Sequence, residues 1–523
     1  MKKNIDFILP PEIAFDNSAF EEFVLKSIGS PTALVNIRPI RRSIDARSRH
    51  IKVNINADIY IGENAPSIIN YDKNKLKNVS NASQALVIGA GPGGIFAALR
   101  LIELGIKPIL IERGKDVRTR RRDLAALTDH VVNPESNYCF GEGGAGTYSD
   151  GKLYTRSKKR GDVRRVLEIL TDHGATEDIL VDAHPHIGTN KLPGVVTNMR
   201  ETIINCGGEV LFNTKVVGLI KENDDLKGIT TSSGEKIHGI GVILATGHSA
   251  RDIFEMLHNN KIYIEAKPYA MGVRIEHQQS FIDQLQYKIS PRGNYLPAAS
   301  YNWVEQINYE NSSRGVFSFC MCPGGFIVPS ATAPGEIVVN GMSPSRRDSK
   351  FSNSGIVMSI EEDDWKHLIK DYGVFAGLEL QKQLETKGCE IAGGNQTAPA
   401  QLMLDFVNEK LSNQLLPTSY QPGLKSVQMT EILPKNMSFR IKEAFKKIDT
   451  KMEGYLSNEA QIVGVESRTS SPIRIPRDKE TFEHVQLKRL FPCGEGAGYA
   501  GGIVSAAMDG ERCAENLALL YGK

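Results

Sequence analysis

Short apolar runs separated by helical or polar stretches recur along this chain, and the clearest case lies at residues 85–112. Ala85–Ile88 is an apolar run of strand length, Ile95–Leu104 has the apolar spacing of a helix, and Pro108–Ile111 is a second apolar run. Runs this short and this apolar are typical of strands buried on both faces of a parallel sheet. The pattern predicts a β-α-β unit.

The first 80 residues show another pattern and are predicted to form a separate module. Asp16 or Asn17 is suited to begin a helix with apolar residues at helical spacing, and Gly29 is suited to end it. Leu34–Ile40 and Ile51–Ile55 are predicted strands, the second because apolar and polar residues alternate. The β-α-β-β order predicts a small α+β module of ferredoxin-like type.

The remaining pattern predicts a nucleotide-binding domain interrupted by an insertion. Residues 70–83 are polar and predict a linker, residues 161–260 continue the α/β pattern, and residues 261–460 mix strands with short helices. The predicted fold class is α/β: a Rossmann-like nucleotide-binding fold with an inserted mixed α+β substrate domain and the N-terminal module. The predicted domain bounds are 1–80, 84–260 (first part of the nucleotide domain), 261–460 (insertion) and 461–523 (its second part).

Composition narrows the class of protein. A chain of 523 residues is too long for a single hydrophobic core, so more than one domain is expected. The 63 basic and 61 acidic residues leave a net charge of +2, so the overall charge indicates neither nucleic acid nor membrane as a partner. No apolar run approaches the roughly 20 residues needed to cross a bilayer. Seven scattered cysteines form no disulfide framework, and the N-terminus is a poor signal peptide. We expect a reduced, cytoplasmic protein, and the sequence carries no signal of its oligomeric state.

A glycine fingerprint follows the first apolar run. Gly89, Gly91 and Gly94 have G-x-G-x-x-G spacing, and Glu112 ends the second run. In such a unit the glycines permit a tight turn and close approach of a pyrophosphate to a helix N-terminus, while the carboxylate binds ribose hydroxyls. The spacing predicts binding of a dinucleotide.

Two further glycine-rich segments extend this prediction. Residues 141–146 hold four glycines, which bring backbone amides close to a flat or anionic ligand. Residues 493–510 place a glycine-rich turn before a helix of small residues, with Glu495 suited to a ribitol or ribose hydroxyl. Two sites about 400 residues apart indicate FAD. The predicted cofactor-binding residues are Gly89, Ala90, Gly91, Pro92, Gly93, Gly94, Glu112, Arg113, Gly144, Ala145, Gly146, Thr147, Ser149, Asp150, Lys152, Val216, Ala245, Thr246, Gly247, Gly494, Glu495, Gly501, Gly502 and Ile503.

Several other side chains are candidates for chemistry. His184 and His186 have no supporting ligand cluster, so we expect a positioning or substrate role and no metal site. Cys320 and Cys322 are not a C-x-x-C pair; we expect their thiols on opposite faces of a strand, as buried structural cysteines. The candidate catalytic residues are Lys152, Cys320, Cys322 and Arg468. The candidates for lining the flavin face are Ser149, Lys152, Cys320, Cys322, Asn340, Gln396, Arg468 and Ser470.

Two clusters of basic residues allow alternative interpretations. The N-terminal hairpin could bind RNA or an acidic substrate, but no aromatic residues interleave its charges, which favours a solvated hairpin or one docked on acidic groups. A second cluster could anchor phosphate, and a solvated face is favoured. The hairpin residues are Arg38, Arg41, Arg42, Arg47, Arg49 and Lys52, and the second cluster is Arg118, Arg120, Arg121 and Arg122.

These motifs together resemble a bacterial family labelled uncharacterised FAD-dependent dehydrogenases. The resemblance rests on Gly-Ala-Gly-Pro-Gly-Gly (89–94), Gly-Gly-Ala-Gly-Thr-Tyr-Ser-Asp-Gly-Lys-Leu (143–153), Phe-Cys-Met-Cys-Pro-Gly-Gly (319–325), Glu-Ser-Arg-Thr-Ser-Ser-Pro (466–472) and Gly-Glu-Gly-Ala-Gly-Tyr-Ala-Gly-Gly-Ile (494–503). It covers nearly the whole chain and implies bound FAD and an inserted domain. The layout is more distantly similar to glutathione reductase and p-hydroxybenzoate hydroxylase types, which carry Asp where this chain has Glu495.

The leading prediction is a soluble FAD-dependent oxidoreductase that transfers hydride through flavin N5 to or from a polar or anionic small molecule. Arg468 suits an anionic substrate or a reduced flavin because its guanidinium is always charged. A second strand–GxGxxG–helix unit is missing from the sequence, so NAD(P)H as a transient electron donor and direct reduction by the substrate both stay open. The alternatives are a flavin-dependent RNA or tRNA modifier and a flavin-bound binding or sensor protein.

Overall fold

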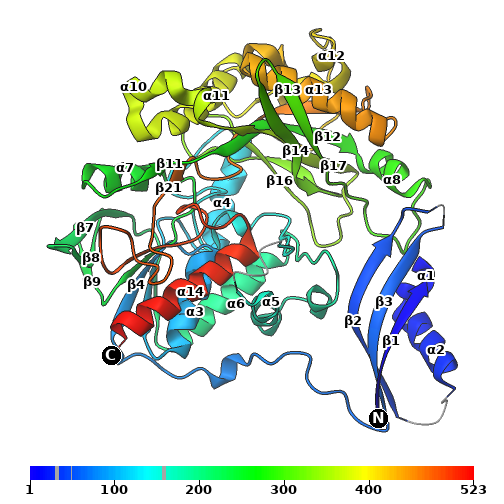
Figure 1. The fold of residues 1–523 in the computed structure, drawn as a ribbon, viewed down its shortest axis with the longest axis horizontal. Coiled ribbons are helices and arrows are strands. Elements are labelled where there is room, and N and C mark those ends of the chain that lie inside the picture. The colour runs from blue at the N-terminus through cyan, green and yellow to red at the C-terminus, as the bar shows by residue number, and fades with distance from the viewer. Residues whose placement is uncertain (30–33, 49, 156–160, 523) are drawn as a thin grey trace.

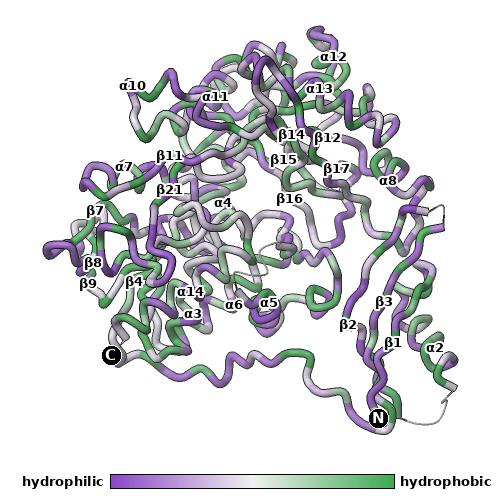
Figure 2. Tube along the Cα trace, viewed as in Figure 1, coloured by the Kyte–Doolittle hydropathy of each residue, from purple (hydrophilic) through white to green (hydrophobic). Residues whose placement is uncertain are grey.

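The computed structural model describes residues 1–29, 34–48, 50–155 and 161–522, and Figure 1 shows three parts. The N-terminal module stands at one side, the nucleotide-binding sheet and its helices form the base, and the inserted domain lies above the base. Figure 2 shows the long connection from the module to the base along the lower edge, with hydrophilic and hydrophobic residues mixed.

The N-terminal module is a three-stranded antiparallel sheet with the order β1-β3-β2. Asp16 caps the second helix by accepting a hydrogen bond from the Ala19 amide, and Gly29 ends it in the left-handed conformation at φ 65°. The predicted helix, strands and β-α-β-β order are confirmed. The elements are β1 (Lys2–Leu9), α1 (Pro11–Ala14), α2 (Asn17–Ile28), β2 (Val35–Asp45) and β3 (Lys52–Ile61).

The basic hairpin β2–β3 docks on the body of the molecule. The Arg42 guanidinium lies 2.7 Å from Asp182 and 3.1 Å from Asp178, and the Arg42 amide donates to the Val181 carbonyl. Arg47 pairs with Asp45 of its own hairpin. Docking on acidic groups is therefore confirmed for Arg42. Arg49 lies outside the described residues.

A five-stranded parallel sheet with the order β22-β10-β4-β5-β6 forms the base. Alternate residues of β4 enter different cores: Val87 packs with α3, α5, α6 and α14, whereas Leu86 packs with α7 and the β7–β9 sheet. Burial on both faces explains the purely apolar strands. The strands are β4 (Gln84–Ile88), β5 (Lys107–Ile111), β6 (Glu209–Leu211), β10 (Val242–Leu244) and β22 (Leu490–Pro492). The covering elements are α3 (Pro92–Glu103), α4 (Val117–Thr128), α5 (Val163–Asp172), α6 (Leu192–Asn205), β7 (Val216–Glu222), β8 (Asp225–Thr231), β9 (Lys236–His238), α7 (Arg251–Asn259) and α14 (Ile503–Tyr521).

The sequence pattern of residues 207–220 predicts one strand that ends near Val216, and this prediction is wrong. The structure has two strands here, β6 and β7, and Val216 begins the second. Between the two strands the Asn213 and Thr214 amides donate to the Gly114 and Glu112 carbonyls, which turns the chain away from the parallel sheet.

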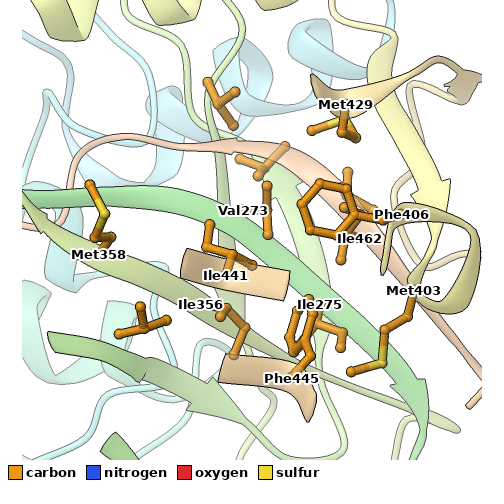
Figure 3. Close-up of a cluster of buried hydrophobic side chains, with 14 of the residues drawn as sticks. Val273, Ile275, Ile356, Met358, Met403, Phe406, Met429, Ile441, Phe445 and Ile462 are labelled. Atoms are coloured by element: carbon orange, nitrogen blue, oxygen red, sulfur yellow. The ribbon is translucent and has the colours of Figure 1, made fainter. Parts of the chain in front are cut away.

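The inserted domain is built on a seven-stranded sheet with the order β13-β14-β17-β12-β20-β18-β19. In Figure 3, Ile441 and Phe445 of α13 pack against Val273 of β12 and Ile356 of β17, and the cluster is fully buried. The strands are β12 (Tyr269–Gln278), β13 (Val304–Tyr309), β14 (Ser312–Cys322), β15 (Phe326–Pro329), β16 (Val339–Met342), β17 (Phe351–Ile360), β18 (Ala398–Leu402), β19 (Leu424–Ser426) and β20 (Ala460–Glu466). The helices are α8 (Gln279–Tyr287), α9 (Glu362–Trp365), α10 (Ile369–Tyr372), α11 (Ala376–Ala392), α12 (Met403–Val407) and α13 (Lys435–Lys451).

The chain enters and leaves the inserted domain through one pair of short strands, here called the neck. β11 (Glu265–Ala266) pairs antiparallel with β21 (Ile473–Arg474). Figure 1 places this pair between the base and the inserted domain, so residues on its faces lie where the two parts meet.

Candidate functional site

The first two glycine-rich segments meet at the N-terminus of α3. Gly91 is the N-cap residue of α3 and makes no side-chain cap, and the Gly143 amide donates to the Ala90 carbonyl at 2.7 Å. A Cβ at Gly144 would lie 3.1 Å from the Gly91 Cα. The uncapped amides and the helix dipole favour an anion at this place.

Glu112 is the central acceptor of this part of the site. It is 4% exposed, and its carboxylate accepts hydrogen bonds from the Ala90, Gly114 and Gly141 amides at 2.9, 2.9 and 3.0 Å. The carboxylate therefore holds the turn after β4, the turn after β5 and the glycine loop together. Its contact with a ribose hydroxyl stays a prediction.

Arg120 shapes the glycine loop from beneath. Its fully buried guanidinium donates to four main-chain carbonyls at 2.8–3.0 Å. The expected solvated face is right for Arg118, Arg121 and Arg122, which are exposed, and wrong for Arg120. Local sequence could not separate them, because α4 turns only one of the four inward. The carbonyls belong to Asn137, Tyr138, Glu142 and Gly144.

The third glycine segment closes the other side of the site. α14 begins at Ile503 behind Gly502, again without a side-chain cap, and α14 packs along α3. A Cβ at Gly510 would lie 2.0 Å from the Gly93 carbonyl oxygen, so glycine is required where the two helices cross. A Cβ at Gly146 would lie 3.3 Å from side-chain atoms of both Ile503 and Pro92. The two uncapped helix N-termini and the glycine loop therefore converge.

Three glycines of the predicted cofactor set face open space. A Cβ at Gly247, Gly501 or Gly502 meets no atom within 4 Å. Gly89, by contrast, packs tightly on the Ala245 carbonyl, where a Cβ would approach to 2.4 Å. Gly247 and Gly502 have φ of 71° and 143°, a conformation that favours glycine, whereas no positive φ requires glycine at Gly501. Gly247 lies against the turn that leads to Gly501 and Gly502, since a Cβ at Gly496 would lie 2.5 Å from the Gly247 carbonyl oxygen, and the three glycines are here called the open row. Open space beside two helix N-termini fits a dinucleotide cofactor.

His248 and Glu495 form a pair beside this open row. Their side chains approach to 3.6 Å, from the turn after β10 and the turn before α14. Burial raises the pKa of Glu495 to about 7, and burial together with Arg468, Lys267 and Arg251 lowers the pKa of His248 to about 4. At neutral pH His248 is therefore uncharged. The sequence analysis missed His248, although it directly follows the Ala-Thr-Gly turn.

The inserted domain contributes Cys320, and a β-bulge controls where its thiol lies. The register of β14 on β17 shifts between Phe319 and Cys322, and Cys320 has φ 44°. A regular strand would put residues two apart on one face; the bulge leaves Cys320 exposed and Cys322 at 1% exposure. The expected burial is thus right for Cys322 and wrong for Cys320, and the expected separation arises from the bulge and not from strand alternation.

Lys152 connects the glycine loop to this bulge. Its ammonium donates to the Met321 carbonyl and lies 3.9 Å from Asp150, which pairs with Arg347 at 2.6 Å. Burial raises the pKa of Asp150, but Lys152 and Arg347 outweigh it and lower the pKa overall. Burial raises the pKa of the accessible Cys320 thiol to about 11. Cys320 therefore lies exposed on the inserted domain, close to Lys152.

Other candidates have structural partners. His186 contacts the Ser345 carbonyl at 3.1 Å, and exposed His184 packs on Tyr154. Gln396 is 2% exposed and donates to the Glu336 carbonyl. Further contacts of predicted residues are Asn340 Oδ1 with Arg274 and the Gly341 amide, Ser149 with the Gly146 carbonyl, Thr147 with the Glu142 carbonyl, and Arg113 with Glu135 and Asp252. Ala145 is exposed, and Thr246 and Ser470 are half-buried.

Arg468 is saturated by protein carboxylates and is unsuited to bind a substrate. Its guanidinium contacts Glu385 through two nitrogens at 2.9 Å and Glu336 at 2.7 Å, and Arg251 contacts the same two carboxylates. Arg468 is 8% exposed and Glu385 is fully buried. The prediction that Arg468 meets an anionic substrate is corrected: it joins the inserted domain to the start of α7.

Cys493, Asp509 and Cys513 form the one group of potential metal ligands found in the described part of the chain. The Arg477 guanidinium already contacts Asp509 at 2.5 Å and the Cys513 sulfur at 3.4 Å, and Asp509 accepts from the Gly494 amide. Because the Arg477 guanidinium already supplies the positive charge at this cluster, the cluster is a structural support of the C-terminal turn.

The fold and site define a protein with a Rossmann-like nucleotide-binding fold and an inserted domain, and sequence matches to known proteins identify its family. A family model described as FAD-dependent protein, C-terminal domain-like, matches residues 268–469, and a domain of unknown function matches residues 1–60. A protein of Clostridium beijerinckii described as uncharacterized is 38% identical over 520 residues, which is 96% of each chain. The chain therefore belongs to this FAD-dependent protein family, and its cofactor is FAD.

Other known proteins match a smaller part of the chain or have lower sequence identity. The tRNA uridine 5-carboxymethylaminomethyl modification enzyme MnmG of Alkaliphilus metalliredigens is 26% identical over 209 residues, 38% of this chain and 28% of that protein. The flavin-dependent brominase Bmp2 has a TM-score of 0.36 at 12% identity and covers 84% of this chain and 80% of its own. A geranylgeranyl bacteriochlorophyll reductase-like protein of Thermoplasma acidophilum has 0.34 at 13%, over 84% and 79%. At these TM-scores the likeness carries no argument. No described helix is both long and apolar enough to cross a membrane.

Proposed function

We propose that the chain is an FAD-dependent oxidoreductase that exchanges a hydride between flavin N5 and a small polar or anionic molecule. The observation that supports this most is the convergence of two helix N-termini that lack a side-chain cap with the glycine loop, beside the open glycines 247, 501 and 502. The exposed Cys320 lies close to Lys152, which follows the glycine loop. FAD, when bound, supplies the electron transfer itself. The protein supplies binding, orientation and electrostatics.

The roles of the chain follow from the geometry. The Gly91 and Gly93 amides at the start of α3 would hold the pyrophosphate of the cofactor, and Glu112 keeps the surrounding turns in place for the ribose. The N-terminus of α14 would favour negative charge on a group bound there. Lys152 holds the Cys320 bulge through the Met321 carbonyl.

The test is an absorbance spectrum of the purified protein followed by anaerobic titration with NADH and NADPH. A flavin spectrum that bleaches with either nicotinamide supports a reductase or monooxygenase. A flavin that stays oxidised with every nicotinamide and metabolite tried favours the alternative of a binding or sensor protein. A colourless protein that FAD cannot reconstitute contradicts the proposal.

A second candidate is a flavin-dependent RNA-modifying enzyme, which the match to a tRNA-modifying enzyme over 209 residues favours. The docked Arg42 removes one charge from the hairpin surface, while Arg41 and Lys52 are exposed. Arg41→Glu with Lys52→Glu should abolish RNA binding in a gel-shift assay and leave FAD content unchanged. RNA binding that is absent in the wild type, or insensitive to both changes, would exclude this candidate.

A further inference from the structure

Two cations at the neck have no acidic partner among the residues that the structure describes, and both lie against the turn that precedes α14. Lys267 directly follows β11 and Arg474 ends β21. The Cδ of Lys267 and the Cβ of Arg474 lie 3.2 and 3.5 Å from the point where a Gly498 Cβ would stand. Both side chains are half-buried.

The polar contacts of this pair are few. Within the described residues the Lys267 ammonium meets only the Pro268 and Ser471 carbonyls, at 3.1 and 3.5 Å, and neither cation has an ion pair. The Nε atom of Arg474 is buried and makes no hydrogen bond there. Glu265 lies directly across from Arg474 in the strand pair, yet no ion pair joins them.

An uncompensated pair of like charges in a half-buried place is unfavourable. Burial and the charge of Arg474 both lower the pKa of Lys267. Such a pair is stabilised when an anion binds between the two cations, and charge-assisted hydrogen bonds to a phosphate or carboxylate are the strong ones. The saturated Arg468, with two carboxylates of its own, is the contrasting case in the same molecule.

The pair also lies beside the proposed flavin site. Gly498 and Tyr499 belong to the turn between Glu495 and the open Gly501, and the Arg474 guanidinium lies 5.8 Å from the Tyr499 ring centroid. Lys267 is close enough to His248 to lower its pKa. An anion held here would place the rest of its molecule at the edge of the open row, where we propose that the flavin binds.

We propose that Lys267 and Arg474 bind a phosphate or carboxylate group of the molecule that exchanges electrons with the flavin. The inference rests on the proposed function and gives its substrate class: an anion anchored at the neck, not at Arg468. A nicotinamide phosphate and a carboxylate metabolite share this chemistry, and the choice of probe distinguishes them.

The experiment uses the FAD-loaded protein and follows the flavin absorbance during titration with inorganic phosphate, pyrophosphate, succinate, NADH and NADPH. The variants are Lys267→Met and Arg474→Met, which keep an unbranched stem, and Lys267→Arg, which keeps the charge. Lys236→Gln on exposed β9 is the matched control. Each lost charge should raise the anion dissociation constant about tenfold, while Lys267→Arg and Lys236→Gln bind as the wild type does.

The outcomes separate the inference from the function. Stronger binding of NADPH than of NADH, lost in the Met variants, identifies a nicotinamide phosphate; a succinate effect lost in the same way identifies a carboxylate. Wild-type protein that holds FAD but binds none of these anions overturns the inference alone. Met variants that lose FAD also overturn it, because the pair would then serve the cofactor itself. Failure of all variants and the wild type to hold FAD contradicts the proposed function instead.

Discussion

Replacing Gly501 by alanine should separate cofactor binding from folding, because the missing side chain faces open space. A Cβ there meets no atom within 4 Å, so apoprotein stability should stay within about 0.5 kcal/mol of the wild type. When FAD fills this space, the added methyl enters a close-packed contact, for which overpacking costs about 1–3 kcal/mol. The FAD dissociation constant should therefore rise roughly 5- to 150-fold.

Gly510→Ala is the matched control on the same helix. Its Cβ would lie 2.0 Å from the Gly93 carbonyl oxygen, so α3 and α14 must move apart and the apoprotein should lose about 1–3 kcal/mol or more. Urea unfolding of the apoprotein and fluorescence titration with FAD measure the two effects. The reasoning is refuted if Gly501→Ala binds FAD as tightly as the wild type, or if it destabilises the apoprotein as much as Gly510→Ala does.

Three further predictions test the buried charges, the exposed Cys320 thiol and the N-terminal module. Burial raises the pKa of Glu385, but Arg251 and Arg468 outweigh it and lower it from 4.5 to about 2. This carboxylate therefore stabilises the fold above about pH 4.5 and loses that effect as pH falls toward 2. Arg468→Met should lower the free energy of unfolding by about 3–5 kcal/mol at neutral pH and should reduce the loss of stability between pH 4.5 and 2, as measured by urea unfolding. An unchanged loss of stability over this pH range would contradict the prediction. Iodoacetamide should label Cys320 before Cys322 in peptide mass mapping, and the labelling should become faster as pH rises toward the thiol pKa of about 11. Bound FAD should slow the labelling, and equal labelling of both thiols would contradict the difference in their exposure. Arg42→Ala should speed proteolysis between β3 and β4 at unchanged FAD content, and an unaltered cleavage rate would show that its ion pairs do not hold the module.

The elements of the nucleotide unit could be predicted because their signal is local. The apolar run predicted at Ala85–Ile88 is β4 (Gln84–Ile88), and the helical stretch predicted at Ile95–Leu104 is α3 (Pro92–Glu103). Strand burial on both faces and helical spacing leave their mark within a few residues. The G-x-G-x-x-G spacing of Gly89, Gly91 and Gly94 is a local signal as well, since it is complete within six residues.

Strand alternation fails where one extra residue enters the ladder. Two residues of β14 oppose one residue of β17 between Phe319 and Cys322, and the alternation of faces is reset there. No local feature of Phe-Cys-Met-Cys predicts this, because the bulge depends on how β14 pairs with β17. The accessible Cys320 could therefore be found only in the structure.

The fate of each cation depends on which acids the fold brings to it. Arg468 meets Glu385 and Glu336, which lie 83 and 132 residues away in the sequence, and is neutralised. Lys267 and Arg474 lie on one face of the neck and meet no carboxylate of the described chain within ion-pair distance. The sequence alone favours Arg468 as the residue that binds an anionic substrate, because its guanidinium is always charged and it stands in the Glu-Ser-Arg-Thr-Ser-Ser motif, which is rich in charged and hydroxyl side chains. Once the charges of the described chain are paired in three dimensions, the cations of the neck left without a carboxylate are Arg474, six residues after Arg468, and Lys267 across the neck. These two, and not Arg468, are therefore suited to bind an anion.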